Sequence, residues 1–172
     1  WLDTLPDDAF DGVILANEVL DAMPVHRFYV HESELKEIRV GCEKNEFVRR
    51  DVEAESVLKD KVTRALSSSV DDYGEDYCSE INIDLDAWVQ SISDCLRQGL
   101  VLLIDYGYSR HEYYHQQRAQ GTLLCHYRHR VHSNPFVFVG LQDITASVDF
   151  TAVAEAAVDS KLSVSGFTTQ AY

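Results

Sequence analysis

The sequence has few basic residues, and this scarcity argues against one large class of partner. It contains 15 Lys and Arg against 29 Asp and Glu, which gives a formal net charge of −14. Proteins that bind nucleic acid contact phosphates through clustered lysine and arginine, so we expect no nucleic acid partner. The negative charge serves solubility, and it also favours a basic partner, such as an arginine- or lysine-rich polypeptide.

Long apolar runs, a leader sequence and closely paired cysteines are also missing. The longest apolar run covers residues 100–104, far short of the roughly 20 residues that a membrane span needs, so we expect no membrane partner. The N-terminus has no basic region followed by an apolar core, and it therefore does not resemble a signal peptide. The four cysteines show no CxxC spacing. They predict reduced thiols, in a bacterial cytoplasm or in a mitochondrial matrix.

Two short apolar runs, residues 12–16 and 99–104, each begin with glycine and end in polar residues. Such runs are typical of strands that are buried on both faces of a parallel sheet. In open α/β sheets, ligands bind outside the carboxyl ends of the strands. The polar residues expected at that edge are Asn17, Glu18, Asp21, Asp105 and Tyr106.

The segment between these two runs begins with a different pattern. Alternating apolar residues over 26–51 predict a small antiparallel meander with turns at 32–34 and 41–45. A helix is expected over 52–66, and a polar linker over 67–77.

Helices are also expected on either side of the second apolar run. Asp84 is placed to cap a helix over 85–96, which Gly99 would end. Farther along, a strand is expected over 122–127, and Asp149 is placed to cap a last helix over 150–158.

The chain has no glycine-rich loop after any expected strand. It also opens almost directly with a central type of strand, which needs a neighbour on each side. We therefore expect the second half of a larger fold. For this chain alone, we expect self-association into a homodimer through the open edge of the strand at 12–16.

Several segments resemble the MidA-like family of S-adenosylmethionine-dependent methyltransferases, which includes the mitochondrial assembly factor that dimethylates an arginine of respiratory complex I. The matching segments are residues 16–25 (ANEVLDAMPV), 104–108 (IDYGY), 118–123 (RAQGTL), 127–129 (YRH) and 140–151 (GLQDITASVDFT). The resemblance runs from residue 12 to about residue 155, in the family's order, and corresponds to its C-terminal half. The family's glycine-rich cofactor loop, and the acidic residue on the following strand, precede Trp1.

The resemblance implies methyl transfer from S-adenosylmethionine to an arginine guanidinium of a protein. Carboxylates can hold a guanidinium in bidentate geometry and orient one of its nitrogens for the reaction. The implied site residues are Glu18, Asp21, Tyr106 and His129 for catalysis, Asn17 and Asp105 for the cofactor, and Arg118 and Asp143 for the substrate. Structural roles stay open for two of them: Asp21 could cap a helix, and Asp105 could satisfy backbone groups in the turn before Gly107.

Two histidine clusters suggest a metal, but neither has convincing ligand spacing. Residues 111–115 (HEYYH) match the HExxH pattern of zinc hydrolases. That pattern needs a helix, whereas here glycines bracket a short polar segment and no third ligand stands out. Cys125, His126, His129 and His132 would alternate between the two faces of a strand, so they could converge only in a loop. We expect no metal.

The predicted fold class is α/β, namely the C-terminal half of a Rossmann-like methyltransferase sheet with a small antiparallel β insertion. The predicted function is S-adenosylmethionine-dependent methylation of arginine in a basic segment of a protein substrate. One alternative is a non-catalytic interaction or assembly module on the same fold. A remote alternative is a zinc hydrolase that uses residues 111–115.

Overall fold

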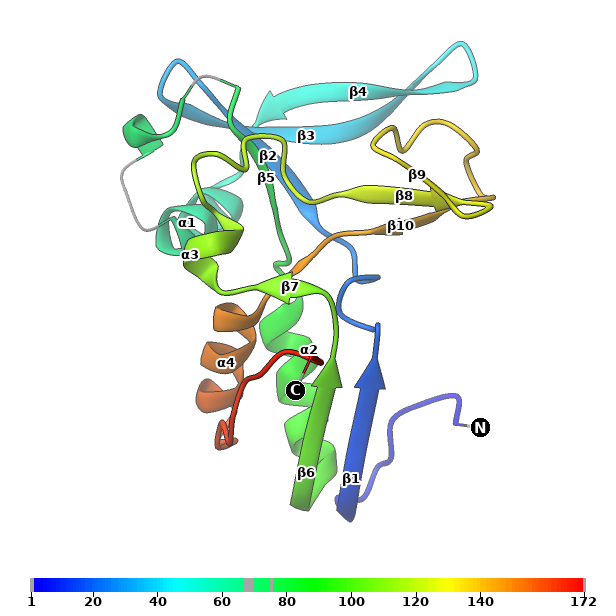
Figure 1. The fold of residues 1–172 in the computed structure, drawn as a ribbon, viewed down its shortest axis with the longest axis vertical. Helices are drawn as coiled ribbons and strands as arrows, with labels where there is room; N and C mark the ends of the chain where they lie inside the picture. The colour runs from blue at the N-terminus through cyan, green and yellow to red at the C-terminus, as the bar shows by residue number, and fades with distance from the viewer. Residues whose placement is uncertain (1, 67–69, 75, 172) are drawn as a thin grey trace.

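The computed structural model describes residues 2–66, 70–74 and 76–171. In these residues the chain has a mixed α/β fold with four small sheets and helices packed between them (Figure 1). No helix in the described ranges is long and apolar enough to span a membrane. All four cysteines are free thiols, as predicted.

The two apolar runs form a parallel pair of strands, β1 (Phe10–Asn17) and β6 (Leu96–Ile104). Figure 1 shows both strands pointing toward the same end of the molecule, with α2 (Leu85–Cys95) and α4 (Phe150–Asp159) beside them. The helices and the segments around the sheet share one apolar core. Its buried members are Leu20, Leu85, Val89, Val148, Val153 and Ala156, with Leu103 of β6 packed against them.

The other face of this parallel pair is open. Val13 and Leu15 of β1 are exposed by 66% and 62%, and their register partners Leu100 and Leu102 by 49% and 46%. The prediction that both strands are buried on both faces is therefore wrong. A two-stranded sheet has only one face covered here, because no second layer lies over it in the described part of the chain.

The meander predicted from alternation is present and forms a four-stranded antiparallel sheet in the order β4-β3-β2-β5. Its strands are β2 (His26–His31), β3 (Glu34–Glu43), β4 (Glu46–Glu53) and β5 (Cys78–Ile81). The sequence analysis did not predict β5, which pairs with β2. The turn expected over 41–45 is shorter, because β3 continues to Glu43 and leaves only Lys44 and Asn45 to reverse the chain.

A second apolar core lies between this sheet and helix α1 (Ser56–Ala65). Buried Phe28 and Val30 of β2 belong to the same cluster as Leu58 and Val62 of the helix. The helix begins four residues later than predicted, because β4 extends to Glu53 and uses the expected first turn as strand.

The segment predicted as a polar linker contributes to this core. Residues 67–69 and 75 of that segment lie outside the described residues. In the rest, Val70–Asp72 form a short 3-10 helix, η1, and Tyr73 and Tyr77 are almost completely buried, with ring centroids 4.5 Å apart. Two aromatic rings can bury a large apolar area, so a mainly polar composition did not prevent this segment from packing inside.

The remaining short strands follow β6. Strands β7 (Gly107–Tyr108) and β11 (Val148–Asp149) form a small parallel pair, and α3 (Arg110–Tyr113) lies between β7 and the last sheet. That three-stranded sheet has the order β10-β8-β9 and consists of β8 (Leu124–Tyr127), β9 (Arg130–His132) and β10 (Asp143–Thr145). The predicted strand at 122–127 therefore begins two residues later.

The expected helix caps have different outcomes. Asp149 caps α4 as predicted, since its side chain accepts hydrogen bonds from the backbone N–H groups of Thr151 (3.0 Å) and Ala152 (3.2 Å). Asp84 stands at the N-cap position of α2 but makes no capping hydrogen bond. Gly99 does not end that helix. The helix stops at Cys95, and β6 follows at once and contains Gly99, where the backbones of β1 and β6 come close together.

Candidate functional site

The carboxyl ends of β1 and β6 meet at the register pair Asn17 and Ile104. Directly after it, the backbone N–H of Glu18 donates to the carbonyl of Ile104 (2.8 Å). Glu18 has φ = 50°, in the left-handed region that residues with a side chain rarely occupy. Such strain persists where the surrounding structure imposes it, and it concentrates at functional sites. Asn17 and Glu18 are both exposed at this edge.

Asp105 ties the two strand ends together. One of its carboxylate oxygens accepts hydrogen bonds from the backbone N–H groups of Leu20 (2.9 Å) and Asp21 (3.3 Å). The other accepts from the N–H of Tyr106 (2.8 Å). The bond to the Tyr106 N–H is the structural role that the sequence analysis left open for Asp105. The bonds to Leu20 and Asp21 add a role that it did not predict, because they hold the loop after β1.

Asp21 is the buried member of the group, with only 7% of its surface exposed. Burial raises the pKa of its carboxyl group, and the negative charges of Asp105, Glu18 and Asp143 raise it further. Three carboxylates therefore lie close enough to Asp21 to repel its charge; we call Glu18, Asp21, Asp105 and Asp143 the carboxylate cluster.

Tyr106 lies at the edge of this cluster and is 65% exposed. The charge of Glu18 and a hydrogen bond with Glu18 raise the pKa of the Tyr106 phenol, with smaller contributions from burial and from the charges of Asp21 and Asp105. The structure thus brings together Glu18, Asp21 and Tyr106, three of the four residues predicted for catalysis. The cluster would favour a cation, because opposite charges stabilise each other most where water is partly excluded.

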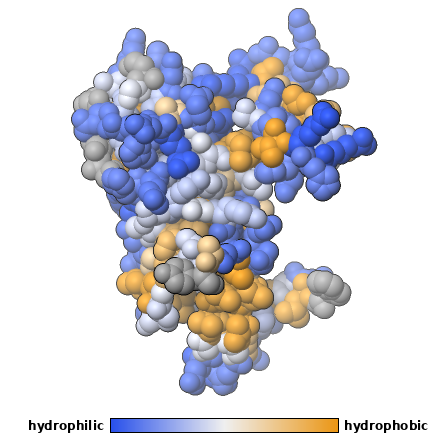
Figure 2. All heavy atoms as spheres, viewed as in Figure 1, coloured by the Kyte–Doolittle hydropathy of each residue, from blue (hydrophilic) through white to orange (hydrophobic). Residues whose placement is uncertain are grey.

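Asp143 reaches the cluster from the three-stranded sheet. It lies on β10, opposite His126 of β8. Three residues later, the N–H of Ala146 donates to the carbonyl of Asp21 (2.9 Å), which joins this segment to the loop after β1. Figure 2 shows the molecule hollowed on the side where the ends of β1 and β6 face this sheet.

Two of the predicted site residues lie apart from the cluster. His129 is exposed in the tight turn between β8 and β9, with φ = 62°. The guanidinium of Arg118 stacks 4.0 Å from the centre of the Tyr108 ring, and its Nε donates to the carbonyl of Glu112 (3.1 Å). None of the hydrogen bonds or ion pairs found in the described ranges joins either residue to the cluster.

The histidine clusters do not form a metal centre in the part of the chain that the structure describes. His111 lies on α3, which has only four residues, and its ring centroid is 6.0 Å from that of His115. Cys125 is fully buried in β8, opposite His132 of β9. Within the described ranges, no three His, Cys, Asp or Glu side chains converge in a way that could hold a metal ion.

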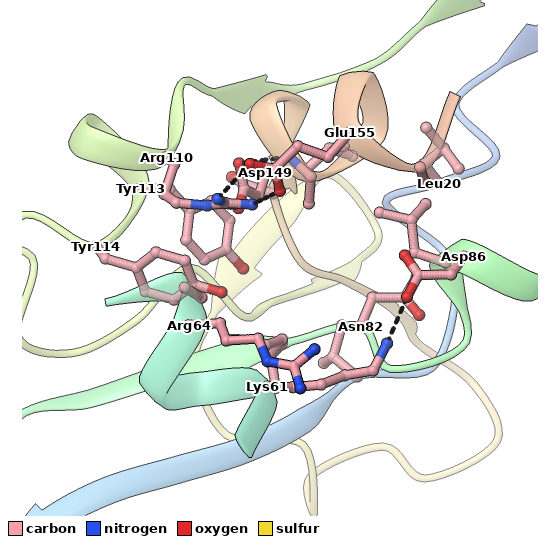
Figure 3. Close-up of a pocket in the computed structure, with 18 of the residues that line it drawn as sticks. Leu20, Lys61, Arg64, Asn82, Asp86, Arg110, Tyr113, Tyr114, Asp149 and Glu155 are labelled. Atoms are coloured by element: carbon pink, nitrogen blue, oxygen red, sulfur yellow. Dashed lines mark hydrogen bonds and ion pairs between the residues drawn. The ribbon is translucent and has the colours of Figure 1, made fainter. Parts of the chain in front are cut away.

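A cavity of about 220 Å³ lies behind the loop after β1, between α1, α2, α3 and α4 (Figure 3). Its charged side chains mostly pair with one another. Lys61 donates to Asp86 (2.7 Å), and Arg110 binds Asp149 (3.1 Å) and Glu155 (2.5 Å). These pairs join the helices, and they leave the cavity no net positive character.

The sequence analysis missed Glu80, the fully buried carboxylate of β5. It accepts hydrogen bonds from Nε of Arg27 (3.0 Å), and from the N–H (2.7 Å) and the hydroxyl (3.2 Å) of Thr122. It therefore joins the antiparallel sheet to the loop that leads into β8. A strand prediction for 78–81 would have placed Glu80 opposite Arg27, but the short CSEI segment carries little strand signal.

Comparison with known proteins supports the broader part of the prediction, a methyltransferase family that depends on S-adenosyl-L-methionine and a mixed α/β fold. Residues 1–168 match the model of a protein family described as "Putative S-adenosyl-L-methionine-dependent methyltransferase". The structure is similar to that of a COG1565 superfamily member from Burkholderia thailandensis bound to S-adenosyl-homocysteine, with a TM-score of 0.83 and 42% identity over 93% of this chain and 40% of that chain. No curated protein matches the chain.

A second crystal structure of a COG1565 superfamily protein from Burkholderia thailandensis gives the same result. Its TM-score is 0.83, its identity is 43%, and the match covers 93% of this chain and 41% of that chain. The chain thus spans about 40% of the length of these solved structures.

Proposed function

The chain belongs to the family of S-adenosyl-L-methionine-dependent methyltransferases whose model its residues 1–168 match, and on that premise we propose that it forms the acceptor side of an enzyme that methylates arginine in a protein. In this proposal, β1 and β6 are central strands of a Rossmann-like sheet, and the carboxylate cluster at their ends holds the substrate. The resemblance of residues 16–25 and 104–108 to MidA-like arginine methyltransferases supports the choice of arginine.

The observation that carries the proposal is the carboxylate cluster at the joined ends of β1 and β6. A guanidinium is a planar cation with five N–H donors, and a carboxylate can bind it through two parallel hydrogen bonds. Glu18 is exposed beside Asp21, so the two can bind different edges of one guanidinium. This arrangement fixes one nitrogen in position, and positioning provides much of the rate in a group transfer.

The same cluster suits the cofactor. S-adenosyl-L-methionine supplies a methyl group on a positively charged sulfur, and an acidic site offsets the repulsion between this charge and the guanidinium. Asn17 is proposed to hydrogen-bond the cofactor, and its exposure at the end of β1 supports this role, whereas Asp105 contributes by fixing the loop after β1.

Proton transfer completes the reaction. As the methyl group's bond to sulfur breaks and the neutral thioether S-adenosyl-homocysteine leaves, the nitrogen that forms the new N–C bond must lose a proton, because the methylated guanidinium would otherwise carry two positive charges. Asp21 is suited to accept it, since its carboxyl group has a raised pKa and is therefore more basic than an ordinary aspartate. Tyr106 lies at the rim and can hydrogen-bond the guanidinium through its hydroxyl, and His129 is proposed for the outer rim.

The test is methyl transfer from labelled S-adenosyl-L-methionine to a peptide that contains one arginine. We expect Glu18→Gln and Asp21→Asn each to lower the rate by at least about 100-fold, in line with the loss of one preorganised catalytic group. Asp60→Asn, a substitution of an exposed carboxylate on α1, is the matched control and should leave the rate unchanged. Equal rates for wild type and both cluster variants would refute the proposal.

The non-catalytic alternative predicts a different result for cofactor binding. Calorimetric titration of the 172-residue chain with S-adenosyl-homocysteine should show binding if Asn17 and the cluster contribute to a cofactor site, and Asn17→Ala should weaken it. A folded chain that binds no S-adenosyl-homocysteine would remove the cofactor part of the proposal and would favour the interaction module.

A further inference from the structure

The carboxylates of this acidic chain are unevenly distributed. The chain has 29 Asp and Glu, yet none lies between Glu112 and Asp143. Arginines and histidines in the same interval give it the opposite charge: Arg118, Arg128, Arg130, His115, His126, His129 and His132. Such a segregated charge creates a local positive field on a negative molecule.

Most of these basic residues gather on the β8–β9 hairpin, residues 124–132, which we call the basic arm. Arg128, His129 and Arg130 occupy its exposed tip, and His126 is exposed on β8. None of the ion pairs found in the described ranges involves Arg128 or Arg130; Arg128 instead stacks 5.3 Å from the centre of the Tyr127 ring. Their guanidinium groups are therefore available to an outside partner.

The basic arm also presents apolar side chains. Val131 is 57% exposed and Leu124 is 42% exposed, and both lie on the same face of the sheet as His126, by the strand register. Surfaces that bind a polypeptide are enriched in arginine and contain apolar area, and the basic arm offers both.

The arm adjoins the carboxylate cluster. His126 of the arm lies directly opposite Asp143 of the cluster in the β8–β10 pair, and its ring hydrogen-bonds the Thr145 hydroxyl (3.4 Å). Arg128 follows His126 by two residues and lies in the tight turn after β8, with φ = 48°. Two residues span at most about 7 Å, and an extended peptide covers that distance in two or three residues, so one peptide can reach both surfaces.

We propose that the basic arm binds acidic residues of the protein substrate, two to five positions away from the arginine that enters the carboxylate cluster. This inference rests on the proposed function. Arg128 and Arg130 at the tip of the hairpin would bind the substrate's Asp or Glu. Leu124 and Val131 lie on one face of the hairpin and would contact apolar residues of the substrate, whereas Arg130 and its register partner Tyr127 belong to the other face. The site thus selects an arginine with acidic residues nearby, in place of the basic segment that the net charge led us to expect, because the two surfaces carry opposite charges.

The experiment measures the binding of three fluorescent peptides to the 172-residue chain by anisotropy. The first carries one arginine followed by two glutamates at positions +3 and +4; the second has glutamines there; the third keeps the glutamates and replaces arginine with neutral citrulline. We expect the first peptide to bind about tenfold more tightly than the second, as two exposed charge contacts would give. The double variant Arg128→Gln/Arg130→Gln should remove this preference, and 0.5 M salt should reduce it.

Arg64→Gln is the matched control, because Arg64 is an exposed arginine on α1, outside the arm. It should leave the preference for glutamate unchanged. Thermal melts of each variant show that the fold persists, since all three positions are exposed.

The outcomes separate this inference from the proposed function. If the first two peptides bind equally and both depend on arginine, the role of the arm is refuted and the proposed function stands. If the citrulline peptide binds as well as the arginine peptide while the glutamate preference remains, the proposed function fails and the arm binds acidic segments on its own. Failure of all three peptides to bind, or a preference of the arm for vesicles of phosphatidylserine over the first peptide, would overturn the inference.

Discussion

Burial and the neighbouring carboxylates disfavour the charged form of Asp21. The same surroundings make Asp21 more basic, as its proposed role of proton acceptor requires. Burial and three nearby carboxylates raise its pKa, so the folded protein binds the Asp21 proton more tightly than the unfolded chain does. Stability therefore falls as the pH rises from the unfolded pKa of Asp21 through its higher folded pKa, and the loss is complete above it. Ionised Asp21 therefore destabilises the fold.

We predict that Asp21→Asn stabilises the protein at pH 7 while it lowers the rate of methyl transfer by at least about 100-fold. The melting temperature should rise by roughly 2–4 °C, the shift that about 1 kcal/mol produces in a domain of this size. The gain should shrink as the pH is lowered, because protonated Asp21 is already neutral. Calorimetric melts at several pH values measure this, and a lower melting temperature for Asp21→Asn at pH 7 would contradict it.

Glu18 affects its neighbour Tyr106 through charge, and its own backbone is strained. We predict that Glu18→Gln lowers the pKa of the Tyr106 phenol toward its usual value of about 10, because the charge of Glu18 is the largest cause of the raised value. Titration of the Tyr106 ring resonances by NMR measures the change, with Tyr106→Phe to assign them. An unchanged Tyr106 pKa in Glu18→Gln would show that the two side chains do not interact.

Glu18→Gly tests the backbone strain at position 18 separately. Glycine accommodates φ = 50° without strain, so this variant should add about 1 kcal/mol of stability.

At the scale of elements, the pairing of β1 with β6 depends on a close approach of two glycines. A Cβ atom on Gly99 would lie 1.7 Å from the carbonyl oxygen of Gly12, its register partner, and Gly99 has φ = +156°. We predict that Gly99→Ala destabilises the protein by about 3 kcal/mol, since the strands must separate to make room. Chemical denaturation measures the loss. Gly166→Ala is the control, because nothing lies within 4 Å of a Cβ there; equal effects for the two variants would count against the role of close approach.

Glu80 holds the antiparallel sheet to the loop before β8. We predict that Glu80→Ala costs roughly 3–5 kcal/mol, the usual effect of removing one partner from a buried ion pair, because Arg27 then keeps a partly buried charge without its carboxylate. The 121–122 loop should also exchange its amide hydrogens faster, since the Thr122 N–H loses its acceptor. Arg27→Met should cost a similar amount, because it leaves the fully buried Glu80 carboxylate without its positive partner, but it should keep the Thr122 amide protected, since Glu80 still accepts its N–H. Normal protection of Thr122 in Glu80→Ala would show that other contacts hold the loop.

Elements that a few consecutive residues determine could be predicted from the sequence, whereas elements that depend on distant residues could not. The apolar runs, the meander and the Asp149 cap were predicted because a few consecutive residues determine them. The position of Gly99 was not, since its close approach to Gly12 joins residues 87 positions apart, whereas a glycine after an amphipathic helix more often ends it. Strand β5 was missed for the same reason: its pairing with β2 fixes it more than its own four residues do.

In the candidate site, too, some features could be predicted from the sequence and others depend on tertiary structure. Glu18, Asp21, Asp105 and Tyr106 were predicted to meet because parallel strands end at one edge. The hydrogen bonds of Asp105 to the loop after β1 could not be predicted, because they depend on how that loop folds back over β6. The place of His129 in the β8–β9 turn, away from the cluster, likewise depends on tertiary structure.

At the scale of the whole molecule, the parallel sheet is the least protected surface. β1 pairs only with β6 in the described part of the chain, so its other edge offers free backbone groups, and two aliphatic pairs cover an open face: Val13 with Leu100 and Leu15 with Leu102. Figure 2 shows hydrophobic side chains gathered in this half of the molecule, while the other half is mostly hydrophilic. Exposed strand edges and apolar patches of this kind promote association.

We therefore predict that the 172-residue chain forms dimers through β1, and that Val13→Lys/Leu15→Lys makes it monomeric, because charged side chains on an edge strand oppose pairing. Sedimentation velocity from about 1 to 100 μM measures the change, and the dimer fraction should rise with concentration only when β1 is unaltered. Val158→Lys, which changes a 61% exposed valine on α4, controls for added charge and for lost apolar surface elsewhere. A wild-type chain that stays monomeric at 100 μM would show that the open face is tolerated without a partner, and association of the double lysine variant would place the contact on another surface.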